Sequence, residues 1–98
     1  MDRAEKKRRV KEWARTERVA ARMKFPLPDH QLQALFAYVN EHLEGEGCDH
    51  SCRFMEGWLS NNGITADPVR TWLEENGGYC DCEVIANAVE AWENNRKP

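Results

Sequence analysis

The sequence has no long hydrophobic stretch. Its longest apolar run, Ala34 to Val39, is far shorter than the roughly 20 residues of a membrane-spanning helix. The first residues are charged and lack the apolar segment of a secretory signal. We therefore expect a cytoplasmic protein with no membrane partner. In a reducing cytoplasm, its four cysteines indicate metal or redox chemistry before disulfides.

Recognisable catalytic motifs are absent as well. The chain has no HExxH pattern, no phosphate-binding glycine loop and no nucleophile motif. Its 98 residues allow one domain and leave little sequence to build a substrate pocket. The hydrophobic share of 41% is ordinary for a globular chain, which excludes wholesale disorder. We expect a folded protein that is not an enzyme.

Charge is unevenly distributed along the chain. Residues 1–24 carry ten Lys/Arg and four Asp/Glu, a net charge of +6. Residues 25–98 carry four and thirteen, a net charge of −9, and together the two parts give the overall −3. We divide the chain into a basic N-terminal helix (1–24) and a compact helical domain with a Cys/His site (25–98).

Residues 2–24 contain no glycine or proline and are rich in good helix formers. Their apolar stripe is thin, which predicts a mostly solvated helix that touches the domain through Trp13. Phe25-Pro26-Leu27-Pro28 ends this helix, because a proline disfavours helix at the preceding residue. A second helix begins at Asp29, a candidate N-cap, and ends near Gly45 and Gly47. Its apolar residues recur with helical spacing, namely Leu32, Leu35, Phe36, Val39 and Leu43.

Two similar strings predict a pair of short helices. Trp58-Leu59-Ser60-Asn61-Asn62-Gly63 and Trp72-Leu73-Glu74-Glu75-Asn76-Gly77 each combine a Trp-Leu anchor with a terminal glycine. Ser51 is a candidate cap for the first helix, and Asp67-Pro68 for the second. We expect these helices to pack as a hairpin.

The last segment, residues 82–95, fits a helix, although a short strand through Cys80–Ile85 is an alternative without a clear partner strand. The prediction is an all-α domain of five helices, with an extended turn before the last one. Trp13 and Trp92, near the two ends, could pack together or bury a dimer contact, so a monomer and a homodimer both stay open.

The sharpest chemical signal is two pairs of metal-ligand residues. Cys48 and His50 are one residue apart, as are Cys80 and Cys82. In extended backbone, side chains at i and i+2 point to the same side, whereas in an α-helix they do not. We therefore predict that both pairs lie outside regular helix and converge on one ion. Three thiolates and one imidazole suit a structural Zn²⁺, which would close the loop around the helix hairpin.

Alternatives to this ligand set stay open. If residues 48–52 were helical, Cys48 and Cys52 would converge and His50 would not. Cys52 is otherwise a small buried hydrophobic residue. All four thiols could also be reduced and metal-free, or Cys80 and Cys82 could carry redox chemistry.

The strings Cys48-Asp49-His50 and Trp72 to Val84, with its Gly-Gly-Tyr-Cys-Asp-Cys-Glu core, resemble a small bacterial family known as domain of unknown function 2695. The basic start at residues 5–9 and the helix at residues 35–39 extend the likeness over nearly the whole chain. The resemblance implies a stand-alone cytoplasmic protein with no assigned activity. In that family the position of Cys52 is usually threonine or leucine-like, which favours Cys48, His50, Cys80 and Cys82 as ligands.

Several functions compete. We favour a zinc-stabilised binding or regulatory module, with a metal-free helical interaction domain as the alternative and an unidentified protein as a partner. The basic helix could bind nucleic acid, but Trp13 is its only aromatic residue and the acidic domain would repel phosphates. A metalloenzyme could use Glu83, Asp49 or Asp81 as a base, but a full Cys₃His set leaves no open metal position. A metal-handling or redox role needs accessible thiolates, which acidic neighbours disfavour.

Overall fold

A computed structural model of the chain describes residues 3–97 and contains helices but no strand in that range. The last three elements run on continuously, so the described residues form five helical segments and the all-α prediction is confirmed. In chain order, the elements are α1 (Arg3–Met23), α2 (Asp29–Glu46), α3 (Arg53–Asn61), α4 (Ala66–Glu75), α5 (Asp81–Glu83), a π-helical turn η1 (Val84–Ala88) and α6 (Val89–Asn95).

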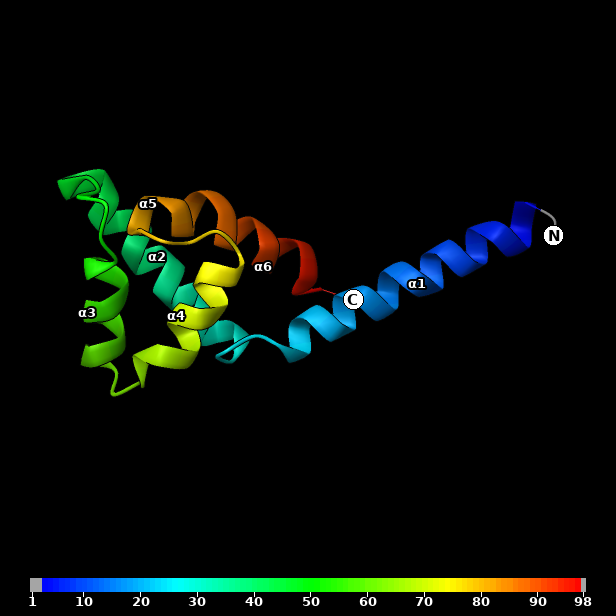
Figure 1. Cartoon of the computed structure of the whole chain (residues 1–98), viewed down its shortest axis with the longest axis horizontal. Coiled ribbons are helices and arrows are strands. Elements are labelled where there is room, and N and C mark those ends of the chain that lie inside the picture. Colours follow the sequence, from blue (N-terminus) through cyan, green and yellow to red (C-terminus); the bar gives the residue numbers. More distant parts are fainter. Residues whose placement is uncertain (1–2, 98) are drawn as a thin grey trace.

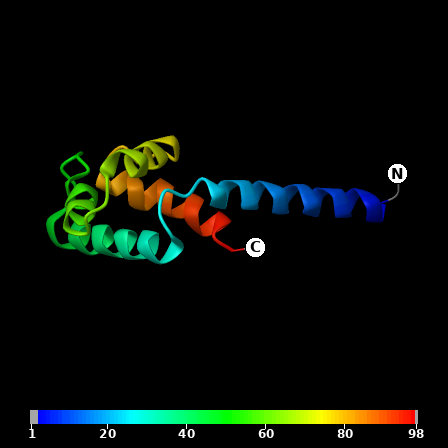
Figure 2. The same cartoon turned by 90° about the horizontal axis from the view of Figure 1, so that it is seen from below.

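Helix α1 projects from a compact body formed by the other helices (Figures 1 and 2). The molecule measures 55 × 24 × 19 Å, and its radius of gyration of 16.1 Å exceeds the roughly 13 Å of a compact chain of 100 residues. Helix α1 has no buried residue. It meets α6 near its own C-terminal end, where Arg22 donates a hydrogen bond to the carbonyl of Asn95 (3.3 Å).

The prediction that Trp13 anchors α1 to the body is wrong, because Trp13 lies on the projecting part of α1 and is 66% exposed. Pairing of Trp13 with Trp92 is wrong for the same reason. Trp92 is buried in the body and makes an edge contact with Phe36, with ring centroids 5.2 Å apart. Trp13 is therefore a large apolar side chain without a core to join.

The core of the body forms around α2. Leu32, Leu35 and Val39 are fully buried, as their helical spacing predicts. Burial of one such side chain contributes roughly 1.5–3 kcal/mol relative to leaving it exposed. The other helices complete the core with Phe36, Phe54, Met55, Leu59, Val69, Trp72, Leu73, Val84, Ala88 and Trp92.

The two Trp-Leu strings form α3 and α4, and both helices end in the same way. The N–H of Ile64 donates to the carbonyl of Leu59 (2.9 Å), and the N–H of Gly78 donates to that of Leu73 (2.7 Å). Before each donor lies a glycine with left-handed backbone, at φ +66° and +82°. This is the Schellman arrangement, which only a residue tolerant of positive φ closes without strain. These glycines are Gly63 and Gly77.

The predicted helix N-caps are wrong at all three helices of the body that were assigned one. Helix α2 is preceded by Pro28, and Asp29 lies in its first turn. The carboxylate of Asp29 accepts hydrogen bonds from Trp92 Nε1 (2.9 Å) and Arg96 (2.7 Å), both near the end of the chain. A tertiary contact has thus replaced a local cap.

At α3 and α4 the residues before the helix, Cys52 and Thr65, make no side-chain capping bond. Ser51 hydrogen-bonds Asp49 instead, and Asp67 lies inside the first turn of α4. The predicted capping residues are thus each displaced by one or two positions from the residue that precedes the helix.

Candidate metal centre

The two ligand pairs lie on either side of the α3–α4 hairpin and meet at one end of the body. The loop between α2 and α3 carries Cys48 and His50, and the segment after α4 carries Cys80. The backbone N–H of Asp81 donates to the carbonyl of Ser51 (3.0 Å), which joins the two segments directly. This intramolecular hydrogen bond therefore closes the loop that, from the sequence, a metal ion was expected to close.

Three of the four predicted ligands form a tight group. One ligand atom each of Cys48, His50 and Cys80 lies within 4.8 Å of the other two. The sulfur of Cys82 lies 3.3 Å from that of Cys80. Tetrahedral coordination with Zn–S bonds of ~2.3 Å places ligand sulfurs ~3.8 Å apart, so the spacing within the three-residue group is of the size that a zinc site requires. The Cys80–Cys82 sulfur separation is shorter, and Cys82 is not part of that group. The donor set, three thiols and one imidazole, has the softness that zinc prefers.

The geometry of the second pair differs from the prediction. Cys80 is extended (φ −145°, ψ 169°), but Cys82 lies inside α5, so the expectation that both cysteines lie outside regular helix is wrong for Cys82. The chain enters the helix directly after Cys80. The pair therefore spans a helix start, and the extended backbone at Cys80 lets its sulfur turn back toward that of Cys82.

The first pair is not extended either. His50 has a left-handed backbone, with φ +68°, and is the only residue other than glycine with positive φ among residues 3–97. Its N–H donates to the sulfur of Cys48 (3.3 Å), and the N–H of Ser51 donates to the carboxylate of Asp49 (3.0 Å). A tight turn therefore brings Cys48 and His50 together. A strained backbone at a non-glycine residue is typical of functional positions.

Asp81, between the two cysteines, has a role that the sequence analysis missed. It is 1% exposed, and its carboxylate accepts the backbone N–H groups of Phe54 (3.0 Å) and Met55 (3.1 Å). These are two of the unpaired donors at the start of α3, so Asp81 caps that helix from 26 and 27 residues away. Burial raises the pKa of Asp81, and the two N–H groups oppose that rise. No local motif could have revealed this cap.

The thiols of the cluster differ in their electrostatic environment. The N–H groups of Cys82 and then His50 point at the sulfur of Cys48 and lower its pKa. Burial raises the pKa of Cys80 to about 12. Cys80 would therefore be protonated at neutral pH unless a cation displaced the proton, whereas Cys48 is stabilised as a thiolate by its surroundings.

Cys52 lies outside this group. It directly precedes α3, packs against the core and donates a weak hydrogen bond to the carbonyl of Tyr79 (3.4 Å). Burial raises the pKa of Cys52 to about 11. Residues 48–52 are not helical, so the alternative in which Cys48 and Cys52 converge on one helix face does not form.

Two acidic side chains border the cluster. Glu83 lies 3.5 Å from the sulfur of Cys80, and Asp49 turns toward Ser51 and Arg53. The cluster can thus hold a soft divalent cation beside a carboxylate.

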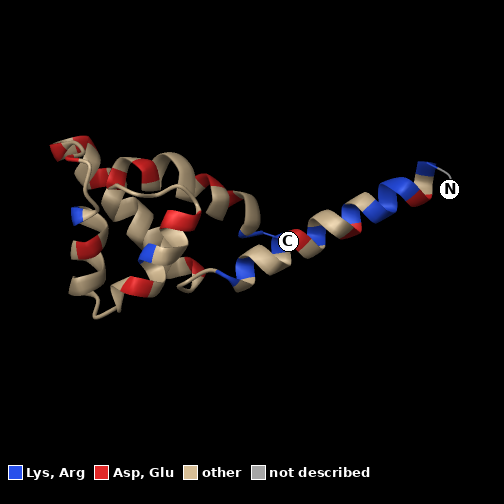
Figure 3. Cartoon of the chain, viewed as in Figure 1, with Lys and Arg blue, Asp and Glu red and all other residues tan. Residues whose placement is uncertain are grey.

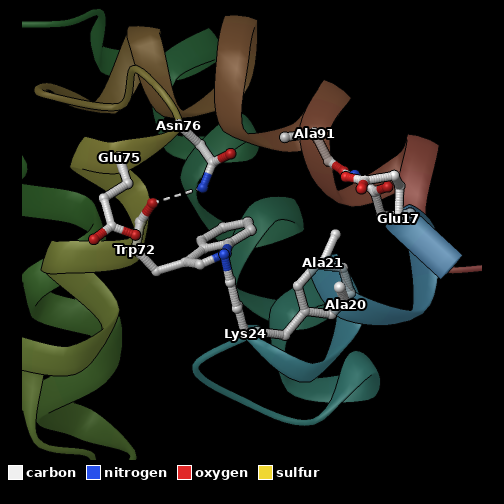
Figure 4. Close-up of a pocket in the computed structure, with 10 residues that line it drawn as sticks. Glu17, Ala20, Ala21, Lys24, Trp72, Glu75, Asn76 and Ala91 are labelled. Atoms are coloured by element: carbon white, nitrogen blue, oxygen red, sulfur yellow. Dashed lines mark hydrogen bonds between the residues drawn. The ribbon is translucent and has the colours of Figure 1, made fainter.

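A separate cleft lies at the other end of the body, between α1, α4 and α6 (Figure 4). It has a volume of about 290 Å³, and Trp72 forms part of its wall. The side chain of Asn76 donates to the carbonyl of Trp72 (2.8 Å) there. The cleft separates α1 from α4, and Phe25, which follows α1, packs edge-on against Trp72 with ring centroids 5.6 Å apart. Helix α1 is thus held by α6 and by the Phe25 linker.

Comparison with known proteins gives a family but no activity. Residues 35–87 match the model of a family described as "Protein of unknown function (DUF2695)". Uncharacterized proteins of Mycobacterium bovis and Mycobacterium tuberculosis are 38% identical over 71 residues, which is 72% of this chain and 72% of theirs. No solved structure matches the chain. Among residues 3–97, every helix is too short or too polar to cross a bilayer.

Proposed function

The chain belongs to the DUF2695 family, and from its Cys/His cluster we propose that it is a zinc-stabilised binding or regulatory module of the reducing cytoplasm. In this proposal Cys48, His50, Cys80 and Cys82 hold one structural Zn²⁺. The observation that carries it is the convergence of Cys48, His50 and Cys80 within 4.8 Å, although His50 and Cys80 are 30 residues apart in the chain.

The surroundings of the cluster support a structural role for the ion. Cys80 and Cys82 flank Asp81, whose carboxylate caps α3, so an ion that fixes the two sulfurs also fixes the cap. The other ligand pair lies just before α3. Zinc would therefore tie both ends of the α3–α4 hairpin to the start of α5. A small domain gains much from such a tie, because apparent zinc free energies in finger peptides are roughly 10–16 kcal/mol.

The same ligand set argues for binding over catalysis. Catalytic zinc keeps a position open for water, usually with three protein ligands, whereas four protein ligands close the site. Glu83 would then tune the charge of the cluster and not act as a base. The binding surface in this proposal is the exposed helix α1, which the stabilised body presents to a partner.

Native mass spectrometry before and after chelation tests the metal. We expect one zinc per chain, lost in Cys82→Ser and retained in the matched variant Cys52→Ser, because Cys52 lies outside the cluster. Thermal melting is followed in parallel, and loss of zinc should lower the midpoint in wild type and in Cys52→Ser.

Two results would contradict the proposal. A wild-type chain without metal, whose melting is unchanged by chelator, would be a metal-free helical domain. Three protein ligands and a bound water in a zinc-loaded structure would favour a metalloenzyme, and the variants above would then be assayed for hydrolytic activity.

A further inference from the structure

We propose that α1 binds the phosphate backbone of duplex nucleic acid, independently of base sequence. Four of its basic residues, Lys7, Arg8, Lys11 and Arg15, are all exposed. At about 100° per residue they fall within an arc of ~100° on one side of the helix. We call these four residues the basic stripe. This inference rests on the binding role proposed for α1 but not on the metal.

The basic stripe is costly to an isolated helix. Lys7 and Lys11, and Lys11 and Arg15, are like charges at i and i+4, and each such pair destabilises a helix by roughly 0.2–0.5 kcal/mol. Burial does not offset this cost, because α1 has no buried residue, and Glu12, at i+4 from Arg8 and i−3 from Arg15, offsets only part of it. A polyanion along the stripe would turn the repulsion into attraction and release condensed counterions.

The position of α1 removes the main objection to nucleic acid binding. The acidic side chains belong mostly to the body, and the basic ones to the helix that projects from it (Figure 3). Helix α1 has 21 residues and is therefore about 31 Å long. At physiological ionic strength, charges are screened over ~8 Å. Phosphates bound along the outer half of α1 would therefore be attracted by the basic stripe and only weakly repelled by the net charge of −9 on residues 25–98.

The residues of α1 favour a duplex over a single strand. Base stacking needs aromatic side chains, and α1 offers only Trp13. The amide side chains that read base edges, Asn and Gln, do not occur in α1. The remaining contact class is to phosphates, for which a straight helix suits the regular backbone of a duplex (Figure 1).

An anionic membrane fits less well. Val10 and Trp13 are the large apolar residues of the outer half of α1, and they are 60% and 66% exposed. Lys6 and Glu17 interrupt the stripe that these residues form with the alanines. Interfacial helices bury a broad, uncharged apolar face, which α1 lacks.

The test is fluorescence anisotropy of a labelled 20-base-pair duplex of mixed sequence, titrated with the full chain across a salt series. The stripe variant is Lys11→Gln/Arg15→Gln. The matched control is Lys6→Gln/Arg9→Gln, which removes one Lys and one Arg from the other side of the same helix. The stripe variant should lower the slope of log K against log [salt] by about 2, and the control by less than 1.

Three results would overturn the inference. They are absence of salt-dependent binding by the wild-type chain, equal loss of affinity in the two variants, and tighter binding to vesicles with anionic lipids than to the duplex. A fourth result, measured by sedimentation of the chain without duplex, would also overturn it. A dimer that forms at low salt and is lost only in the stripe variant would mean that α1 binds the acidic body of a second copy. Zinc content is measured on every sample. Zinc-free protein that still binds the duplex contradicts the proposed metal site alone, and zinc-loaded protein that does not bind contradicts this inference alone.

Discussion

Helix α1 and the body are both helical, but they are stable for different reasons. In the body, Leu32, Leu35 and Val39 are completely removed from water, whereas in α1 even Val10 and Trp13 are mostly exposed. Short helices in proteins derive most of their stability from such burial. Helix α1 therefore relies on helix propensity and a small contact with α6. The difference shows that a good helix former does not need to be part of the core, and it yields four predictions.

The largest difference should appear when an apolar side chain is shortened in each region. Leu73→Ala removes a fully buried side chain of α4, and we expect a loss of about 2–5 kcal/mol in the free energy of unfolding. Val10→Ala on α1 should change it by less than about 0.5 kcal/mol. Urea unfolding followed by circular dichroism measures both. Similar losses in the two variants would mean that α1 is packed in solution.

Two glycine substitutions test how tightly the body is packed beside the metal cluster. A Cβ at Gly78 would lie 3.0 Å from Val84 Cγ2 and 3.1 Å from the carbonyl oxygen of Leu73, so Gly78→Ala should cost about 1–3 kcal/mol. Gly57, in the middle of α3, has open space around the same position. Gly57→Ala should gain up to about 1 kcal/mol through helix propensity. Thermal melting of the pair should shift in opposite directions.

Asp81→Asn tests the cap that links the cluster to α3. The variant keeps the size of the side chain but loses its charge and one of its two acceptor oxygens, and we expect a loss of about 1–2 kcal/mol. Asp49→Asn is the matched control, since Asp49 lies next to a ligand but is exposed, and it should cost less than about 0.5 kcal/mol. Equal effects in the two variants would show that the cap contributes no stability beyond a surface turn.

The smallest expected effect is on the free energy of unfolding at acidic pH. The hydrogen bond from Arg96 to Asp29 lowers the pKa of that carboxyl, and Trp92 adds to the shift. Because the folded pKa lies below the unfolded one, the stabilisation is complete above the unfolded value of about 3.9 and disappears as pH falls through the folded value. Asp29→Asn should therefore lose less stability than wild type between pH 6 and pH 3, by less than about 1 kcal/mol since Asp29 is partly exposed.

Denaturant unfolding at the two pH values measures the acid effect. Asp67→Asn serves as the control, because it removes the charge of another aspartate whose side chain is 88% exposed. Its acid sensitivity should match wild type. An Asp29→Asn curve parallel to that of wild type would show that the Asp29–Arg96 contact does not hold the end of α6 in solution.

Much of the fold could be predicted from local sequence. The spacing of Leu32, Leu35 and Val39 places α2 and its buried face, and the glycines at 63 and 77 end α3 and α4. These signals are local, because helical periodicity and positive φ are properties of a few neighbouring residues. The position of Trp13 could not be predicted, since its exposure depends on the direction in which α1 leaves the body.

The candidate metal centre likewise has features that the sequence determines and features that only the tertiary structure decides. The sequence by itself determined the ligand types and their pairing in the chain, because cysteine and histidine at i and i+2 carry their chemistry wherever they lie. Only the tertiary structure decided that Cys82 lies inside a helix, that His50 adopts a left-handed backbone and that Asp81 caps α3. The Asp81 cap joins atoms that are 26 and 27 residues apart in the chain, and such contacts follow from packing and not from local propensity.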